Sequence, residues 1–213
     1  MKFGKVMSEL LKKIAEGEGV SLDFKFRVDD QKKIARTLAA YANTEGGSLL
    51  IGVKDNGKVA GADPEEEYYM VEGAASMYCR PAVPIESKVW KEGHHLVLEI
   101  IVCKSDLRHK AVTEEGDWKT YYRIDDNTAK GNKILDKVWF YQREGVKRSR
   151  SFSEDEMDLL AFIRTNELVS ISKIYKASKM KMNQTDNFIA ALLHWEVLSM
   201  VFSDDGIRYG LSE

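Results

Sequence analysis

The spacing of apolar residues changes twice within the first thirty positions. Leu10, Leu11 and Ile14 recur at helical intervals between lysines and glutamates, which predicts a helix that ends near residues 16–17. Residues 21–28 instead alternate apolar and charged side chains, as a half-buried strand does. The charged positions on one face of this expected strand are Asp23, Lys25 and Arg27.

The next segment combines a helical pattern, a glycine pair and an apolar run. An aspartate at position 29 or 30 can cap the helix, and Gly46 and Gly47 can take the positive φ that ends it. The run over 48–53 predicts a central strand, and Asp-Asn-Gly at 55–57 is typical of a tight turn between strands. We interpret the glycine pair as a structural turn, because the sequence lacks a phosphate-binding G-x-x-x-x-G-K-[ST] motif.

The chain between residues 65 and 143 mixes helical and strand patterns. The expected elements are a helix over 65–79, strands over 85–90, 96–103 and 119–124, and a helix over 132–143. The first region is therefore predicted to be α+β, with a mixed β-sheet of roughly six strands and about four flanking helices.

A second, smaller region follows a polar and basic stretch at 145–150. Ser153 and Glu156 have capping-box spacing ahead of an apolar helical stripe. Two further helices are expected from about 170 and 183, and a β-hairpin after them. This order is that of a winged helix-turn-helix. We therefore expect a first domain over 1–146, a linker over 147–152 and a small winged-helix domain over 153–213.

Composition narrows the class of protein only slightly. The 213 residues are 44% hydrophobic and 31% charged, as in ordinary globular proteins, and the net charge of −2 indicates no particular partner. No window has the length of a signal peptide core or a membrane span, so we expect a cytoplasmic protein with no membrane partner. Cys79 and Cys103 form no CxxC motif, and both are expected to be buried.

Several unusual residues coincide in one order between positions 40 and 61. The run reads A-x-x-N-T-x-G-G-x-L-x-I-G-V-x-D-x-G-x-x-x-G, and it lies between the segments LDFK and YYRIDDNTAK. Over roughly residues 8–145 the chain resembles the AlbA-type domain of the Schlafen family. The resemblance implies DNA-binding regulators with a C-terminal winged helix, as in many bacterial members, or RNA cleavage at three carboxylates, as in some eukaryotic ones.

Three carboxylates are candidates for that nuclease site. Glu18, Asp23 and Asp55 match the acid-x4-acid and G-V-x-D elements of the nuclease members, except that Asp23 stands where the nuclease pattern has Glu. Such oxygen ligands suit Mg²⁺ or Mn²⁺, which could activate water against a phosphodiester. The alternative is that Asp55 only begins the turn and that Asp23 pairs with a lysine.

Basic and amide side chains are candidates for nucleic-acid contact. In the first domain they are Lys25, Arg27 and Arg123, although a solvated, self-neutralising strand face is an alternative. In the second domain they are Lys176, Lys181, Gln184 and Asn187. The second region's acidic balance opposes such contact: six lysines and arginines stand against ten carboxylates over 151–213, two of them at 204–205 in the expected wing tip.

These features favour a nucleic-acid-binding protein, with DNA as the partner, that regulates transcription without a cofactor. The first alternative is a metal-dependent endoribonuclease that uses Glu18, Asp23 and Asp55 with Mg²⁺ or Mn²⁺. The second is a protein–protein scaffold, a homodimer held together through the winged helix.

Overall fold

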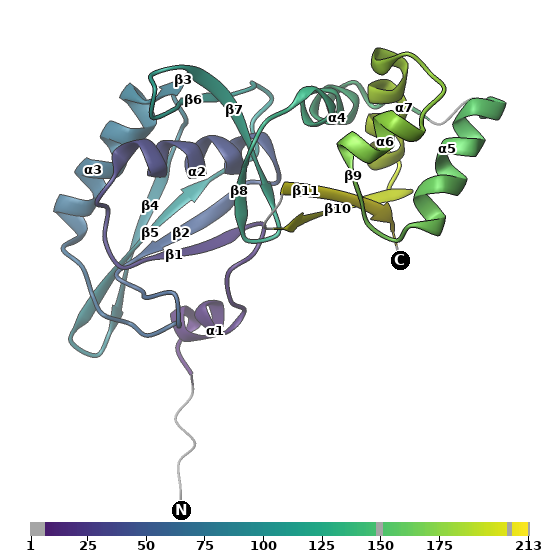
Figure 1. Ribbon diagram of the computed structural model, residues 1–213. Coiled ribbons are helices and arrows are strands. Elements are labelled where there is room, and N and C mark those ends of the chain that lie inside the picture. The colour runs from purple at the N-terminus through teal and green to yellow at the C-terminus, as the bar shows by residue number, and fades with distance from the viewer. Residues whose placement is uncertain (1–6, 148–150, 204–205, 213) are drawn as a thin grey trace, which may run out of the picture. The chain divides into compact units, whose positions relative to one another are not determined.

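The chain forms two compact units, Met1–Lys130 and Gly131–Glu213. The computed structural model describes residues 7–147, 151–203 and 206–212 (Figure 1). The boundary falls earlier than the expected 146, because helix α4 (Lys133–Glu144) packs Ile134 and Val138 into the core of the second unit. Of the expected linker over 147–152, residues 148–150 lie outside the described residues.

The first unit contains a four-stranded sheet whose strand order is β1-β2-β5-β4. Its strands are β1 (Leu22–Lys25), β2 (Gly47–Ile51), β4 (Glu86–Glu92) and β5 (His95–Val102). β1 and β2 run parallel and the other pairs are antiparallel, so α2 (Gln31–Asn43) is the crossover that joins the parallel pair. β1 therefore lies at an edge of the sheet.

A second, antiparallel sheet has the order β3-β6-β7-β8. Its strands are β3 (Cys79–Arg80), β6 (Lys110–Val112), β7 (Trp118–Ile124) and β8 (Asn127–Lys130). Five of the roughly six expected strands are present, whereas the strand expected after the turn at 55–57 is only an isolated bridge between Val53 and Val59. The strands β3, β6 and β8 were not expected, because they are too short to show a period. The α+β class with a mixed sheet and flanking helices is confirmed.

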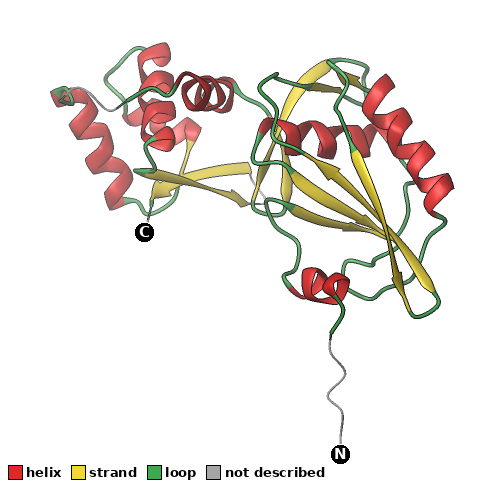
Figure 2. Ribbon diagram, turned by 180° about the vertical axis from the view of Figure 1, so that it is seen from behind, coloured by secondary structure: helices red, strands yellow, loops and turns green. Residues whose placement is uncertain are grey.

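Both faces of the first sheet are covered by helices. α2 and α3 (Pro64–Met77) lie over one face, and the short α1 (Glu9–Ala15) lies over the other (Figures 1 and 2). Adjacent side chains of β2 divide between these layers, since Leu49 packs into the α2 side and Leu50 into the α1 side. A residue of this sheet can therefore be buried on either face.

The Asn-Thr-Glu-Gly-Gly run closes α2 and fixes its end. The Asn43 side chain donates to the carbonyls of His109 (2.8 Å) and Tyr121 (2.9 Å) and accepts from the His109 amide (2.8 Å). Gly46 has φ +78°, and a Cβ at Gly47 would lie 2.5 Å from the ring of Tyr41. The run therefore ends the helix and turns the chain into β2, in agreement with the expected glycine turn.

The two cysteines differ in their surroundings. Cys79 is buried as expected, and burial raises the pKa of its thiol to about 12. Cys103 is exposed, contrary to expectation, because the strand β5 ends at Val102 and leaves the next residue outside the sheet.

The second unit continues from α4 with three further helices and a three-stranded sheet of order β10-β11-β9. The elements are α5 (Glu154–Thr165), β9 (Val169–Ser170), α6 (Ile171–Ala177), α7 (Met182–His194), β10 (Leu198–Ser203) and β11 (Gly206–Leu211). Ser153 and Glu156 form the expected capping box at α5. The expected acidic tip at 204–205 lies outside the described residues.

No helix in the described ranges is both long and apolar enough to cross a lipid bilayer.

Candidate functional site

A pocket of about 420 Å³ opens beside the edge strand β1 of the first unit. Its walls come from the segment around β1, from α2 and from the β7–β8 hairpin, with Asp55 from the turn after β2. Four carboxylates and four cations line it: Glu18, Asp23, Asp55 and Asp126, with Lys25, Lys33, Arg36 and Arg123. Thr37, Asn127 and Thr128 add hydroxyl and amide groups.

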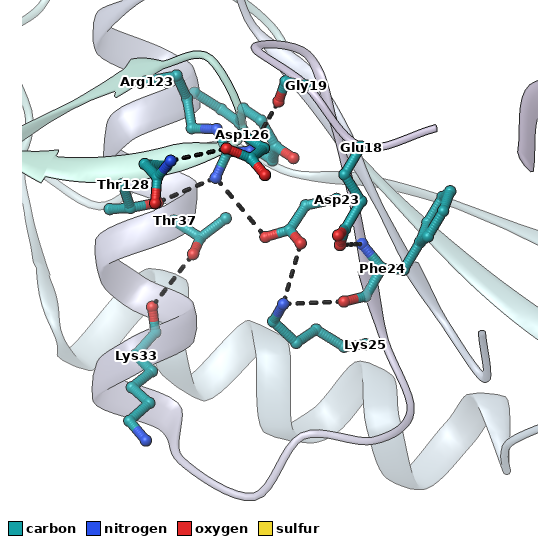
Figure 3. A network of polar contacts seen from close by, with 12 residues as sticks. Glu18, Gly19, Asp23, Phe24, Lys25, Lys33, Thr37, Arg123, Asp126 and Thr128 are labelled. Atoms are coloured by element: carbon teal, nitrogen blue, oxygen red, sulfur yellow. Dashed lines mark hydrogen bonds and ion pairs between the residues drawn. The ribbon is translucent and has the colours of Figure 1, made fainter. Parts of the chain in front are cut away.

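Asp23 is buried in this pocket wall, with 6% of its surface exposed. The sequence placed it on the polar face of β1, but that face is covered as well. Its Oδ1 accepts a 2.9 Å hydrogen bond from Lys25 Nζ, and its Oδ2 lies 3.7 Å from Nη1 of Arg123 (Figure 3). The alternative that Asp23 pairs with a lysine is thus confirmed, and a second cation lies beside the same carboxylate.

Arg123 is also buried, with 4% of its surface exposed. Nη2 donates to the Gly19 carbonyl at 2.7 Å, and Nη1 donates to the Thr128 hydroxyl at 3.1 Å (Figure 3). The guanidinium carbon lies 5.2 Å from the ring centroid of Tyr41, which is itself buried. Arg123 therefore holds the β7–β8 hairpin to the segment before β1, and it is not an open phosphate contact.

Glu18 stands beside Asp23 and is partly buried. Its Oε1 accepts a 2.8 Å hydrogen bond from the Phe24 amide (Figure 3). Burial, and then the neighbouring Asp23, raise the pKa of Glu18 above its usual range. Asp55 is exposed in the turn after β2, so it fits the expected role of a turn residue.

The three carboxylates line one pocket, but they do not fit a three-carboxylate metal centre. Within residues 7–147, 151–203 and 206–212, no group of three or more His, Cys, Asp or Glu is arranged to hold a metal ion. Asp23 is already neutralised by Lys25 and Arg123, and Glu18 already accepts from a backbone amide. We therefore derive no step that passes through a metal.

Lys25 and Arg27 do not share a basic strand face. β1 ends at Lys25, and Arg27 is exposed beyond it and does not line the pocket. The sequence reasoning missed Lys33 and Arg36, which contribute to the pocket from α2. Their three-residue spacing on the polar side of the helix was a usable indication.

The candidates in the second unit differ in their accessibility. Lys176 and Lys181 are exposed, as is Gln184, whose Oε1 accepts a 3.1 Å hydrogen bond from the Lys181 amide. Asn187 is half-buried, and its Oδ1 accepts from Lys137 Nζ of α4 at 2.5 Å. The part of α7 that solvent reaches is therefore mainly its first turn.

The first unit is an α+β domain in which two four-stranded sheets pack around α2, and its sequence identifies the family. The family model described as Schlafen, AlbA_2 matches residues 18–132, which is more than half of the chain. The chain therefore belongs to this family, over a range somewhat narrower than the expected 8–145.

Two solved structures are similar to the chain at low identity. The crystal structure of the DIP2311 protein from Corynebacterium diphtheriae is 20% identical with a TM-score of 0.43, and the match covers 74% of this chain and 38% of that one. The solution structure of the N-terminal domain of a RecG-related protein from Nitrosomonas europaea is 20% identical with a TM-score of 0.40, covering 68% and 93%. This chain thus spans well under half the length of the first structure. No curated protein matches the sequence.

Proposed function

We propose that this protein binds nucleic acid, DNA in the first place, and that it acts as a transcriptional regulator. The observation that carries the proposal is the convergence of cations on one open pocket. Lys25, Lys33 and Arg36 reach it from β1 and α2, beside the buried Arg123. Phosphate contacts of lysine and arginine supply most of the affinity of such proteins.

Carboxylates pair with most of these cations, and Nη2 of Arg36 lies 3.3 Å from Oε1 of the exposed Glu114. Asp23 accepts from Lys25 and lies beside Arg123, and Asp126 accepts from the Asn127 amide at 2.7 Å. Lys33 is exposed and has no ion-pair partner among the residues that the structure describes. Lys33 thus remains a cation of this pocket that a phosphate backbone can reach.

The second unit supports the DNA part of the proposal through the order of its elements. α6 and α7 are joined by residues 178–181, the four-residue connection of a helix-turn-helix, and the β10–β11 hairpin follows as a wing would. In such modules the N-terminal residues of the second helix read base edges. The exposed first turn of α7, with Lys181 and Gln184, is available for that role, and Lys176 would contact phosphate.

Membership of the Schlafen AlbA_2 family is consistent with nucleic-acid binding. The nuclease alternative is not favoured by a specific observation, because Glu18, Asp23 and Asp55 do not form a metal-holding group.

The proposal is tested by binding in a series of salt concentrations. Fluorescence anisotropy of labelled duplex DNA, single-stranded DNA and RNA should show that the logarithm of the association constant falls linearly with the logarithm of salt concentration. Lys33→Gln should reduce that slope by about 1, as expected for one lost phosphate contact. Lys91→Gln is the matched control, because Lys91 is exposed on β4, at the edge of the first sheet that is opposite to β1 and its pocket.

A flat salt response, or equal slopes for Lys33→Gln and Lys91→Gln, would refute this site. Stronger binding to RNA than to duplex DNA would refute the choice of partner. The same probes incubated with Mn²⁺ test the enzyme alternative: cleavage that is lost in Asp55→Asn would contradict a purely binding role.

A further inference from the structure

The second unit contains a larger pocket of about 650 Å³ that shares no lining residue with the pocket of the first unit. α4, α5 and α7 and the segments next to them provide its walls. A volume between about 300 and 1,000 Å³ is typical of a small-molecule site. Its apolar lining consists of Tyr141, Val146, Met180, Phe188, Ala191 and Trp195.

Aromatic rings form a fixed apolar wall in this pocket. Phe152, which lies outside the pocket lining, packs edge-to-face on the lining residue Phe188 with ring centroids 5.2 Å apart, and it stacks on Trp195 at 6.5 Å with an interplanar angle of 16°. The Trp195 indole N–H donates to the Val146 carbonyl at 3.1 Å, which fixes the orientation of that ring. Flat rings held in place in this way favour a flat aromatic ligand.

Two of the charged groups that line the pocket are already engaged. The buried Glu156 accepts a 2.9 Å hydrogen bond from the Ser153 amide as part of the capping box. Lys179 forms a 2.7 Å ion pair with Asp158. Neither group is therefore free to set the charge preference of the pocket.

The remaining charges favour an anion. Lys147 and Lys181 line the pocket, and neither has an ion-pair partner in the described part of the chain, whereas Asp155 is the one further carboxylate in the lining. The N-terminal end of α7, beside Lys181, adds the positive end of a helix dipole.

We propose that this pocket binds a flat aromatic molecule that carries one anionic group. The ring lies against Phe188 and Trp195, and the anionic group is directed toward Lys147 and Lys181. This binding requires no nucleic acid and goes beyond the function proposed above. Because Lys181 and Gln184 also belong to the expected DNA contacts, an occupied pocket would compete with DNA for them.

The test uses 8-anilinonaphthalene-1-sulfonate, an aromatic anion that fluoresces when it leaves water, with the whole 213-residue chain. We expect saturable binding at one site per chain. The double variant Lys147→Glu/Lys181→Glu should raise Kd by about tenfold, since it reverses both unpaired cations. Lys173→Glu is the matched control on the exposed side of α6, outside the pocket lining, and it should change Kd by less than about twofold.

A second variant and a second probe separate specific binding from general adhesion to apolar surface. Ala191→Leu adds volume to the pocket wall and should also weaken binding, with thermal unfolding measured to confirm that the unit still folds. N-phenyl-1-naphthylamine, which lacks the sulfonate, should bind more weakly and should not respond to the charge reversal. Absence of saturable binding, or an unchanged Kd in both pocket variants, would overturn the inference. Salt-dependent DNA binding would be unaffected by that failure.

Discussion

Each unit buries an aspartate, but the two compensate its charge differently. Asp23 of the first unit is 6% exposed and lies between two cations, Lys25 and Arg123. Asp186 of the second unit is 1% exposed and accepts a 2.5 Å hydrogen bond from the Tyr175 hydroxyl. One carboxylate is thus neutralised by full charges, and the other is held by a neutral donor.

The difference shows how each unit is held together. The ion pair between Asp23 and Arg123 joins β1 to β7, which are far apart in the sequence, so it stabilises a long-range tertiary contact. The hydrogen bond from Tyr175 to Asp186 joins the neighbouring helices α6 and α7. Removing a cation from a buried pair leaves an uncompensated charge, whereas removing a neutral donor leaves an acceptor unsatisfied. The first loss should therefore be the larger.

Arg123→Met should have the largest effect. It leaves Asp23 buried with only the partly exposed Lys25, and it also removes the bonds to Gly19 and Thr128. We expect a loss of about 3–5 kcal/mol in the free energy of unfolding, measured by urea denaturation. Amide hydrogen exchange should localise the loss to the first unit.

The double variant Asp23→Asn/Arg123→Met is the control for that result. It removes the buried charge as well as its partner, so it should recover part of the lost stability. A double variant that is less stable than Arg123→Met alone would show that the ion pair is not the source of the loss.

Tyr175→Phe should destabilise the second unit by about 1–3 kcal/mol, because it leaves the buried Asp186 without its hydroxyl donor. Tyr69→Phe is the matched control, since Tyr69 is highly exposed. Thermal unfolding followed by circular dichroism measures both. A loss as large as that of Arg123→Met would remove the distinction between the two units.

Lys33→Gln and Lys181→Gln compare the two units as nucleic-acid contacts. Each should weaken duplex binding by about 1 kcal/mol at low salt, roughly fivefold, if each side chain contacts a phosphate. Anisotropy with the double variant then shows whether the two units bind one duplex. If they do, weakening either unit also reduces the affinity gained by linking both units in one chain. An effect confined to one variant would assign binding to that unit alone.

Glu18→Gln should produce the smallest effect, and it depends on pH. A raised pKa means that the folded protein binds the proton of Glu18 more tightly than the unfolded chain does, so the wild type loses stability as pH rises through that pKa. The variant lacks this loss. Its stability relative to wild type should therefore grow from about pH 4 to pH 7, by less than about 1 kcal/mol because solvent screens a partly exposed group.

Glu16→Gln is the matched control for this pH series, because Glu16 is an exposed carboxylate two positions earlier in the chain. Denaturation midpoints at each pH give the comparison. A difference between Glu18→Gln and wild type that stays constant with pH would contradict the assignment.

Local features were predictable from the sequence, because neighbouring residues determine them. The helix cap falls at Asp30, one of the two aspartates that the sequence offered, and the capping box at Ser153 and the glycine turn that closes α2 are present as predicted. The period of two in β1 showed which side chains share a face, but it could not show that helices cover both faces. Asp23 therefore appeared to be a surface residue.

The pocket itself was only partly predictable. Glu18, Asp23 and Asp55 all line it, but the pairing of Asp23 with two cations and of Glu18 with a backbone amide depends on tertiary contacts. Arg123 is 100 positions away from Asp23 in the sequence, and no periodic pattern connects the two. Lys33 and Arg36 reach the pocket from α2, and the side of that helix that faces the pocket is set by its packing against the sheets.

The position of α4 has a practical consequence for dissecting the chain. A fragment begun at residue 153, where the sequence suggested a domain start, would lack the helix that carries Ile134 and Val138 and would bare the apolar side of α7. Such a piece is expected to self-associate or to stay partly unfolded. A fragment that begins at residue 131 keeps α4 packed on α7, and it is the fragment with which the second unit should be expressed alone.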